Sequence, residues 1–206
     1  MLLWHGSGES AAAMAPLGEA LAHDFGLRCI APDAPGHGEE PRARPEEYLP
    51  SRLAKRAAAL LDERGVDRVA WIGHSWGASV GCRFAALFRA RTRALVLLEG
   101  GHLDFRDLPR WEPPADADPV TRAMVDGLLV EPAAEVYPAL ASSRVPVLVV
   151  SGADAGAWAS LGFDPLARLR NAVPQAETRL LAGAGHELPA RADVAALVGE
   201  WLAARA

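Results

Sequence analysis

The chain has 206 residues, of which 50% are hydrophobic and 23% charged, and its formal net charge is −5. This length suits one domain with a single core, and the composition is that of an ordinary globular protein. No block of like charges indicates a nucleic-acid or membrane surface. The start carries no secretory signal and no stretch is long enough to cross a bilayer, so we expect a cytoplasmic protein. Cys29 and Cys82 lie in apolar runs and are expected to be reduced core thiols.

Short apolar runs alternate with helical patterns along the chain. The apolar runs predict strands at residues 1–5, 27–31, 68–72, 93–98, 145–151 and 177–181. The helical patterns predict helices at residues 10–25, 51–64, 76–90, 164–172 and 189–204. This alternation predicts an α/β fold, with a mostly parallel sheet and helices on both faces.

Residues 101–144 break this alternation between the fourth and fifth predicted strands. They are rich in Pro, Asp and Arg. We interpret them as a small cap insertion of loops and short helices within one domain of residues 1–206. Such an insertion can cover a site at the carboxyl ends of the strands.

The sharpest local signal is Gly73-His74-Ser75-Trp76-Gly77, which follows a predicted strand and opens a predicted helix. In that context G-x-S-x-G indicates a nucleophile elbow, a strand-to-helix turn tight enough to push the serine hydroxyl out over the sheet edge. The flanking glycines avoid clashes in such a turn. Ser75 is therefore the candidate nucleophile.

Three further motifs extend this signal in chain order: His5-Gly6-Ser7-Gly8, Ala31-Pro32-Asp33-Ala34-Pro35-Gly36-His37-Gly38, and Gly183-Ala184-Gly185-His186. Together the four motifs resemble the α/β-hydrolase superfamily over nearly all of the chain. The resemblance implies an α/β-hydrolase fold and a serine esterase with a catalytic triad. It also marks one departure, because the first two strands usual for the family are absent. We expect the sheet edge left in this way to be covered by another segment or by the second subunit of a homodimer.

A serine hydroxyl is a weak nucleophile at neutral pH and needs an adjacent base. The resemblance places that base at His186, in the loop after the last strand. It gives His5 the role of organising the oxyanion loop. His74 is expected to point back into the strand layer, and His102 is a candidate for the substrate pocket.

The acid that would orient His186 has several candidates. The usual family position follows the strand at residues 145–151, but Gly152-Ala153-Asp154-Ala155 places Asp154 one residue early. Some relatives carry the acid after the preceding strand, where Glu99 stands before two glycines. We favour Glu99, keep Asp154 as the alternative, and leave Asp104 open.

The resemblance also implies an oxyanion hole. Its donors would be the backbone amides of Trp76 and of Ser7, with Gly8 as the alternative to Ser7. Large aromatic side chains are candidate walls of the substrate pocket; these are Trp4, Trp76, Trp111 and Trp158.

The expected function is hydrolysis of a carboxylic ester or related acyl bond in a small molecule through an acyl-serine intermediate, with no metal or cofactor. Thioesterase, lactonase and carbon–carbon bond hydrolase chemistry remain open, because all of them use the same residues. Ser75 argues against haloalkane dehalogenases and epoxide hydrolases of this fold, which use an aspartate nucleophile. A binding module that has lost catalysis is the alternative from another class.

Overall fold

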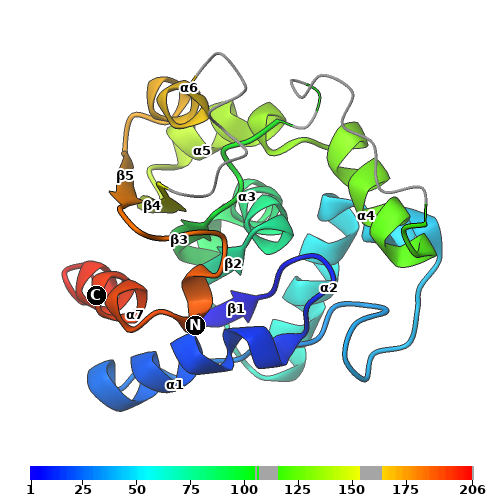
Figure 1. The fold of residues 1–206 in the computed structure, drawn as a ribbon, viewed down its shortest axis with the longest axis horizontal. Coiled ribbons are helices and arrows are strands. Elements are labelled where there is room, and N and C mark those ends of the chain that lie inside the picture. The colour runs from blue at the N-terminus through cyan, green and yellow to red at the C-terminus, as the bar shows by residue number, and fades with distance from the viewer. Residues whose placement is uncertain (105, 107–115, 154–163, 206) are drawn as a thin grey trace.

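A parallel β-sheet forms the centre of the molecule (Figure 1). We analysed a computed structural model that describes residues 1–104, 106, 116–153 and 164–205. All neighbouring strands are parallel, in the order β1-β2-β3-β4-β5. The strands are β1 (Leu2–Trp4), β2 (Val69–His74), β3 (Thr92–Leu98), β4 (Val147–Gly152) and β5 (Ala176–Leu181).

Helices cover both faces of this sheet, which confirms the predicted fold class. On one face α1 and α7 lie side by side near the two termini (Figure 1). On the other face α2 and α3 pack against the strands, and α4 and α5 of the insertion extend this layer. The helices are α1 (Ala11–Phe25), α2 (Pro50–Glu63), α3 (Trp76–Leu87), α4 (Pro119–Val130), α5 (Tyr137–Ser143), α6 (Pro165–Ala172) and α7 (Ala192–Ala203).

Alternation along the strands explains why the core has two layers. Successive side chains of a strand point to opposite faces. In β3, Leu95 and Leu97 therefore pack with α2 and α3, whereas Val96 and Leu98 pack with α1 and α7. All four are fully buried. Apolar side chains on both faces are what a parallel sheet covered by helices requires.

The prediction of a strand at residues 27–31 is wrong. In the structure this segment makes one isolated parallel bridge, between Ile30 and Leu2. The Leu3 amide donates to the Ile30 carbonyl over 2.8 Å, and the Ile30 amide donates to the Met1 carbonyl over 2.9 Å. Pro32 follows and has no N–H to continue such a ladder, so pairing stops after one register step. The segment nevertheless lies along the outer edge of β1.

The C-terminal helix also begins later than predicted. Leu188–Ala190 form a 3₁₀ turn, and α7 starts only at Ala192. Among the described residues, no helix has both the length and the apolar character that crossing a membrane requires.

Candidate active site

Ser75 occupies a strained turn between β2 and α3. Its backbone has φ 49° and ψ −114°, in a region that residues other than glycine rarely adopt. The Ser75 amide donates to the Leu98 carbonyl over 2.8 Å, which ties the turn to the end of β3. The side chain of Ser75 is half-buried. Strain of this kind is held by surrounding structure and is concentrated at functional sites.

Close backbone packing explains the glycine that follows. A Cβ on Gly77 would overlap the carbonyl oxygen of Trp4. Gly77 therefore lets the first turn of α3 lie directly against the end of β1, where the loop from His5 to Gly8 begins. The start of α3 and this loop consequently share one edge of the sheet.

Hydrogen bonds fix the loop from His5 to Gly8, which we call the oxyanion loop. His5 is fully buried; its Nδ1 donates to the Gly6 carbonyl over 2.8 Å, and its Nε2 accepts from the Ala34 amide over 3.0 Å. A carbonyl can only accept and an amide can only donate, so these partners define a neutral ring. Burial is the main reason why the pKa of His5 is lowered, which agrees with this state.

The neighbouring amides of this loop differ in their partners. The Gly8 amide donates to Nε2 of His37 over 3.3 Å, while Nδ1 of His37 donates to the Pro35 carbonyl over 2.9 Å. No hydrogen bond between described residues uses the amide of Ser7. Trp76 is the first residue of α3, where backbone amides have no partner within the helix. Among the described residues, neither the Ser7 amide nor the Trp76 amide therefore has a backbone partner, which is what the expected donor role requires.

His186 lies in the loop after β5, where it is partly covered but keeps part of its surface open to solvent. The centre of its ring is 4.7 Å from that of His74, the residue before Ser75. Partial burial lowers the pKa of His186, and the neighbouring His74 lowers it further. Both effects favour the neutral imidazole, which is the form that accepts a proton.

Glu99 is buried at the end of β3, with a left-handed backbone of φ 49°. Its carboxylate accepts from the Ser151 hydroxyl over 2.9 Å and from the Gly152 amide over 2.6 Å. A Cβ on Gly152 would overlap the carbonyl oxygen of Ala184, so the end of β4 packs closely against the loop of His186. Glu99 therefore approaches the histidine loop from the end of β4, and its negative charge acts to raise the pKa of His186.

The other two candidates for the acid are Asp104 and Asp154. Asp104 is buried and is engaged by Arg106, whose Nε and Nη2 donate to its carboxylate over 3.0 Å and 2.7 Å. This ion pair gives Asp104 a partner of its own. Asp154 lies outside the described residues.

The candidate pocket residues are mostly covered. His102 is 1% exposed and hydrogen-bonds through Nδ1 to the Gly100 carbonyl over 3.0 Å, so it does not reach an open surface. Trp4 and Trp76 are also buried, and Trp4 stacks on Trp71 with ring centres 5.3 Å apart. Trp111 and Trp158 lie outside the described residues.

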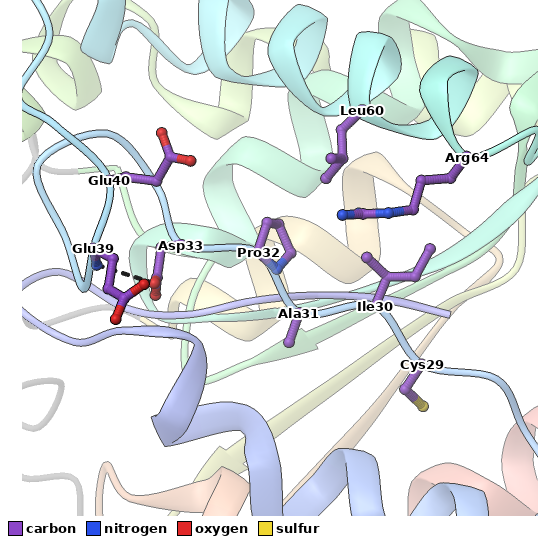
Figure 2. A pocket seen from close by; sticks show the side chains of 9 residues that line it. All are labelled: Cys29, Ile30, Ala31, Pro32, Asp33, Glu39, Glu40, Leu60 and Arg64. Carbon is purple, nitrogen blue, oxygen red and sulfur yellow. Dashed lines mark hydrogen bonds between the residues drawn. The ribbon is translucent and has the colours of Figure 1, made fainter.

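A cavity of about 620 Å³ lies elsewhere, between the segment at the outer edge of β1 and α2 (Figure 2). Asp33, Glu39 and Glu40 line one side, and Leu60 of α2 and Arg64, the residue that follows α2, line another. None of Ser75, Glu99 or His186 belongs to its lining. We therefore assign no part of the candidate active site to this cavity.

Sequence reasoning missed Glu9. Its Oε2 accepts from the Gly6 amide over 2.7 Å and lies 3.0 Å from Nδ1 of His74. The Nε2 atom of His74 lies 2.9 Å from the carbonyl oxygen of His186. His74 is fully buried, and its ring lies between the His186 loop and a carboxylate that no motif marked.

Curated proteins match parts of this chain. Epoxide hydrolase A of Mycobacterium tuberculosis is 36% identical over 99 residues, which cover 48% of this chain and 30% of that protein. Lipase LipV of the same organism is 41% identical over 80 residues, covering 38% and 30% respectively. The matches therefore span under a third of the length of these relatives.

Solved structures match nearly the whole chain, and a family model matches more than half of it. A monoacylglycerol lipase from Paleococcus ferrophilus superposes with a TM-score of 0.74 at 18% identity, covering 100% of this chain and 94% of that one. At this identity the likeness shows the fold. A family model described as the alpha/beta hydrolase fold matches residues 1–126, which is more than half of the chain. The chain therefore belongs to the α/β-hydrolase fold family.

Proposed function

We propose that the protein is a serine hydrolase that cleaves a carboxylic ester through an acyl-serine intermediate. The observation that carries this proposal is the strained backbone of Ser75, at φ 49°, between β2 and α3. Such strain persists only where surrounding structure holds it, and at the opening of a helix it turns the hydroxyl toward a substrate.

In the proposed mechanism His186 accepts the proton of Ser75 as the Ser75 oxygen attacks the acyl carbonyl. The amides of Ser7 and Trp76 donate to the oxyanion that forms. His186 then passes the proton to the leaving alcohol, and water attacks the acyl-enzyme with His186 again as base. Glu99 orients His186 from the end of β4.

Relatives support hydrolysis without choosing its substrate. They include proteins named as a lipase and as epoxide hydrolases. The serine at the elbow of this chain favours acyl transfer over epoxide opening, since epoxide hydrolases of this fold use an aspartate there. Ester cleavage is the broadest of the reactions that an activated serine performs.

The test is covalent labelling with a fluorophosphonate, read by intact mass. We expect one adduct on the natural chain, and none on Ser75→Ala or His186→Ala. Ser79→Ala is a matched control, because Ser79 is a buried serine in the next turn of α3 and should leave labelling intact. A panel of esters and thioesters then measures which bond is cleaved.

Two results would oppose the proposal. Absence of an adduct on the folded natural chain would favour a binding module on a hydrolase fold. An adduct that persists in Ser75→Ala would assign the nucleophile to another residue.

A further inference from the structure

A buried histidine joins two loops of the candidate active site. His74, which is fully buried, lies between Glu9, just after the oxyanion loop, and the loop that carries His186. Its Nε2 is 2.9 Å from the carbonyl oxygen of His186. Because a carbonyl oxygen only accepts hydrogen bonds, this nitrogen must carry a proton.

The second ring nitrogen of His74 also faces an acceptor. Nδ1 lies 3.0 Å from Oε2 of Glu9, and the same oxygen accepts from the Gly6 amide over 2.7 Å. An ionised carboxylate only accepts hydrogen bonds, so Nδ1 carries a proton as well. With both nitrogens acting as donors, the ring is an imidazolium paired with a carboxylate. This pairing meets the requirement that a buried charge has a partner.

The electrostatics of the cluster agree with this assignment. Burial lowers the pKa of His74, but the hydrogen bond and negative charge of Glu9, with smaller help from the His186 carbonyl and Glu187, outweigh it and raise the pKa overall. Burial acts to raise the pKa of Glu9, yet His74 and the Gly6 amide bring it below its usual value. Both shifts favour the ion pair.

We propose that Glu9 and protonated His74 form a charged clamp that ties the oxyanion loop to the loop of His186 and keeps His186 neutral as the base. This inference rests on the function proposed above. Gly6 is the point where the clamp contacts the oxyanion loop. It lies so close to the clamp that a Cβ on Gly6 would stand 2.9 Å from Oε2 of Glu9 and 3.1 Å from Nδ1 of His74.

The clamp holds His186 in two ways. The hydrogen bond from Nε2 of His74 fixes the backbone of His186, and the positive ring 4.7 Å away disfavours a second positive charge on His186. The groups that oppose this second effect are Glu99, Glu187 and Glu9, whose negative charges favour protonation of His186. Of these charged neighbours, His74 has the largest effect on His186. Glu9 and His74 are accordingly positioning residues.

The first test measures protonation directly and needs no activity. Ring signals of the six histidines are followed by NMR from about pH 5 to about pH 9, with His74→Gln and His186→Gln to assign them. We expect the His74 ring of the natural chain to be doubly protonated at neutral pH and to lose a proton only at higher pH. Glu9→Gln should make His74 neutral at neutral pH and move the titration midpoint of His186 upward. A neutral His74 ring in the natural chain would overturn the clamp.

The second test removes the negative charge of the clamp. In Glu9→Gln the side-chain amide can donate to Nδ1 of a neutral His74 and so keep the bond from His74 to His186, but the Gly6 amide then loses its acceptor. We expect fluorophosphonate labelling to fall about threefold more at about pH 6 than at about pH 8.5, because His186 must be neutral to act as base. Asp24→Asn is the matched control, since it removes the carboxylate of an exposed pair with His23.

The two proposals can fail separately. An unchanged labelling profile in Glu9→Gln would overturn the clamp and leave the serine hydrolase intact. Loss of labelling in the natural chain would remove the hydrolase, while the NMR titration would still decide whether His74 is charged and whether it moves the midpoint of His186.

Discussion

Gly100 and Ser75 lie backbone against backbone: a Cβ on Gly100 would overlap the carbonyl oxygen of Ser75. The end of β3 thus supports the strained turn directly, together with the bond from the Ser75 amide to the Leu98 carbonyl. We expect Gly100→Ala to lower the free energy of unfolding by about 1–3 kcal/mol, because backbone must move to admit the methyl group. Chemical denaturation measures this change.

A matched glycine provides the control for that experiment. A Cβ on Gly185 would meet no atom within 4 Å, so Gly185→Ala should change the free energy of unfolding by less than about 0.5 kcal/mol. Equal stability of Gly100→Ala and Gly185→Ala would contradict the packing argument.

The acid of the proposed triad is tested by neutral replacements at the three candidate carboxylates. Glu99→Gln replaces one accepting oxygen by a donor facing Ser151 and Gly152. We expect it to slow ester hydrolysis by about 10²–10⁴-fold, as the imidazolium of His186 loses its partner. Asp104→Asn, which weakens the ion pair with Arg106, should slow it less than about threefold. A larger loss in Asp154→Asn than in Glu99→Gln would assign the acid to Asp154.

The oxyanion loop offers a prediction about backbone amides. Ser7→Pro removes the amide proposed to bind the oxyanion, and we expect kcat to fall by about 10²–10³-fold. Ser7→Ala keeps that amide and loses only a long contact of 3.8 Å from the hydroxyl to the Met124 sulfur, so kcat should fall less than about threefold. Equal losses in both variants would show that the side chain, not the amide, matters.

Buried neutral histidines make stability depend on pH. Burial lowers the pKa of His5 and of His102, so below about pH 6.5 the unfolded chain binds protons that the folded chain does not. The free energy of unfolding should therefore fall as the pH drops below about 6.5. His74, with its raised pKa, acts in the opposite sense, and its stabilisation is lost as the pH rises through the folded value.

Urea titrations at about pH 8 and about pH 5.5 measure this dependence. His5→Asn should lessen the fall between the two values, because one of the buried groups is gone. Glu9→Gln should steepen it, because the opposing contribution of His74 disappears. A natural chain that becomes more stable at about pH 5.5 would contradict the argument.

The fold and the nucleophile turn could be predicted from sequence because their signals are local. An apolar run buried on both faces predicts a parallel strand wherever it occurs. The turn at Ser75 needs glycines and a strand–helix context that five consecutive residues and their neighbours supply. Bounds were less predictable: residues 27–31 are as apolar as a strand but make only one bridge, because the ladder with β1 stops at Pro32.

Relations between distant residues were decided only by the tertiary structure. Glu9 and His74 are 65 positions apart, and no pattern in either segment indicates that they meet. His102 follows β3 in the sequence, and only the packing shows that it is 1% exposed. The sequence by itself determined a parallel α/β sheet with Ser75 in a strained elbow, since those depend on local residue types. The environment of the histidines depends on how the ends of the five strands pack along one edge of the sheet. That packing brings together residues from distant parts of the chain, so no local sequence pattern reveals it.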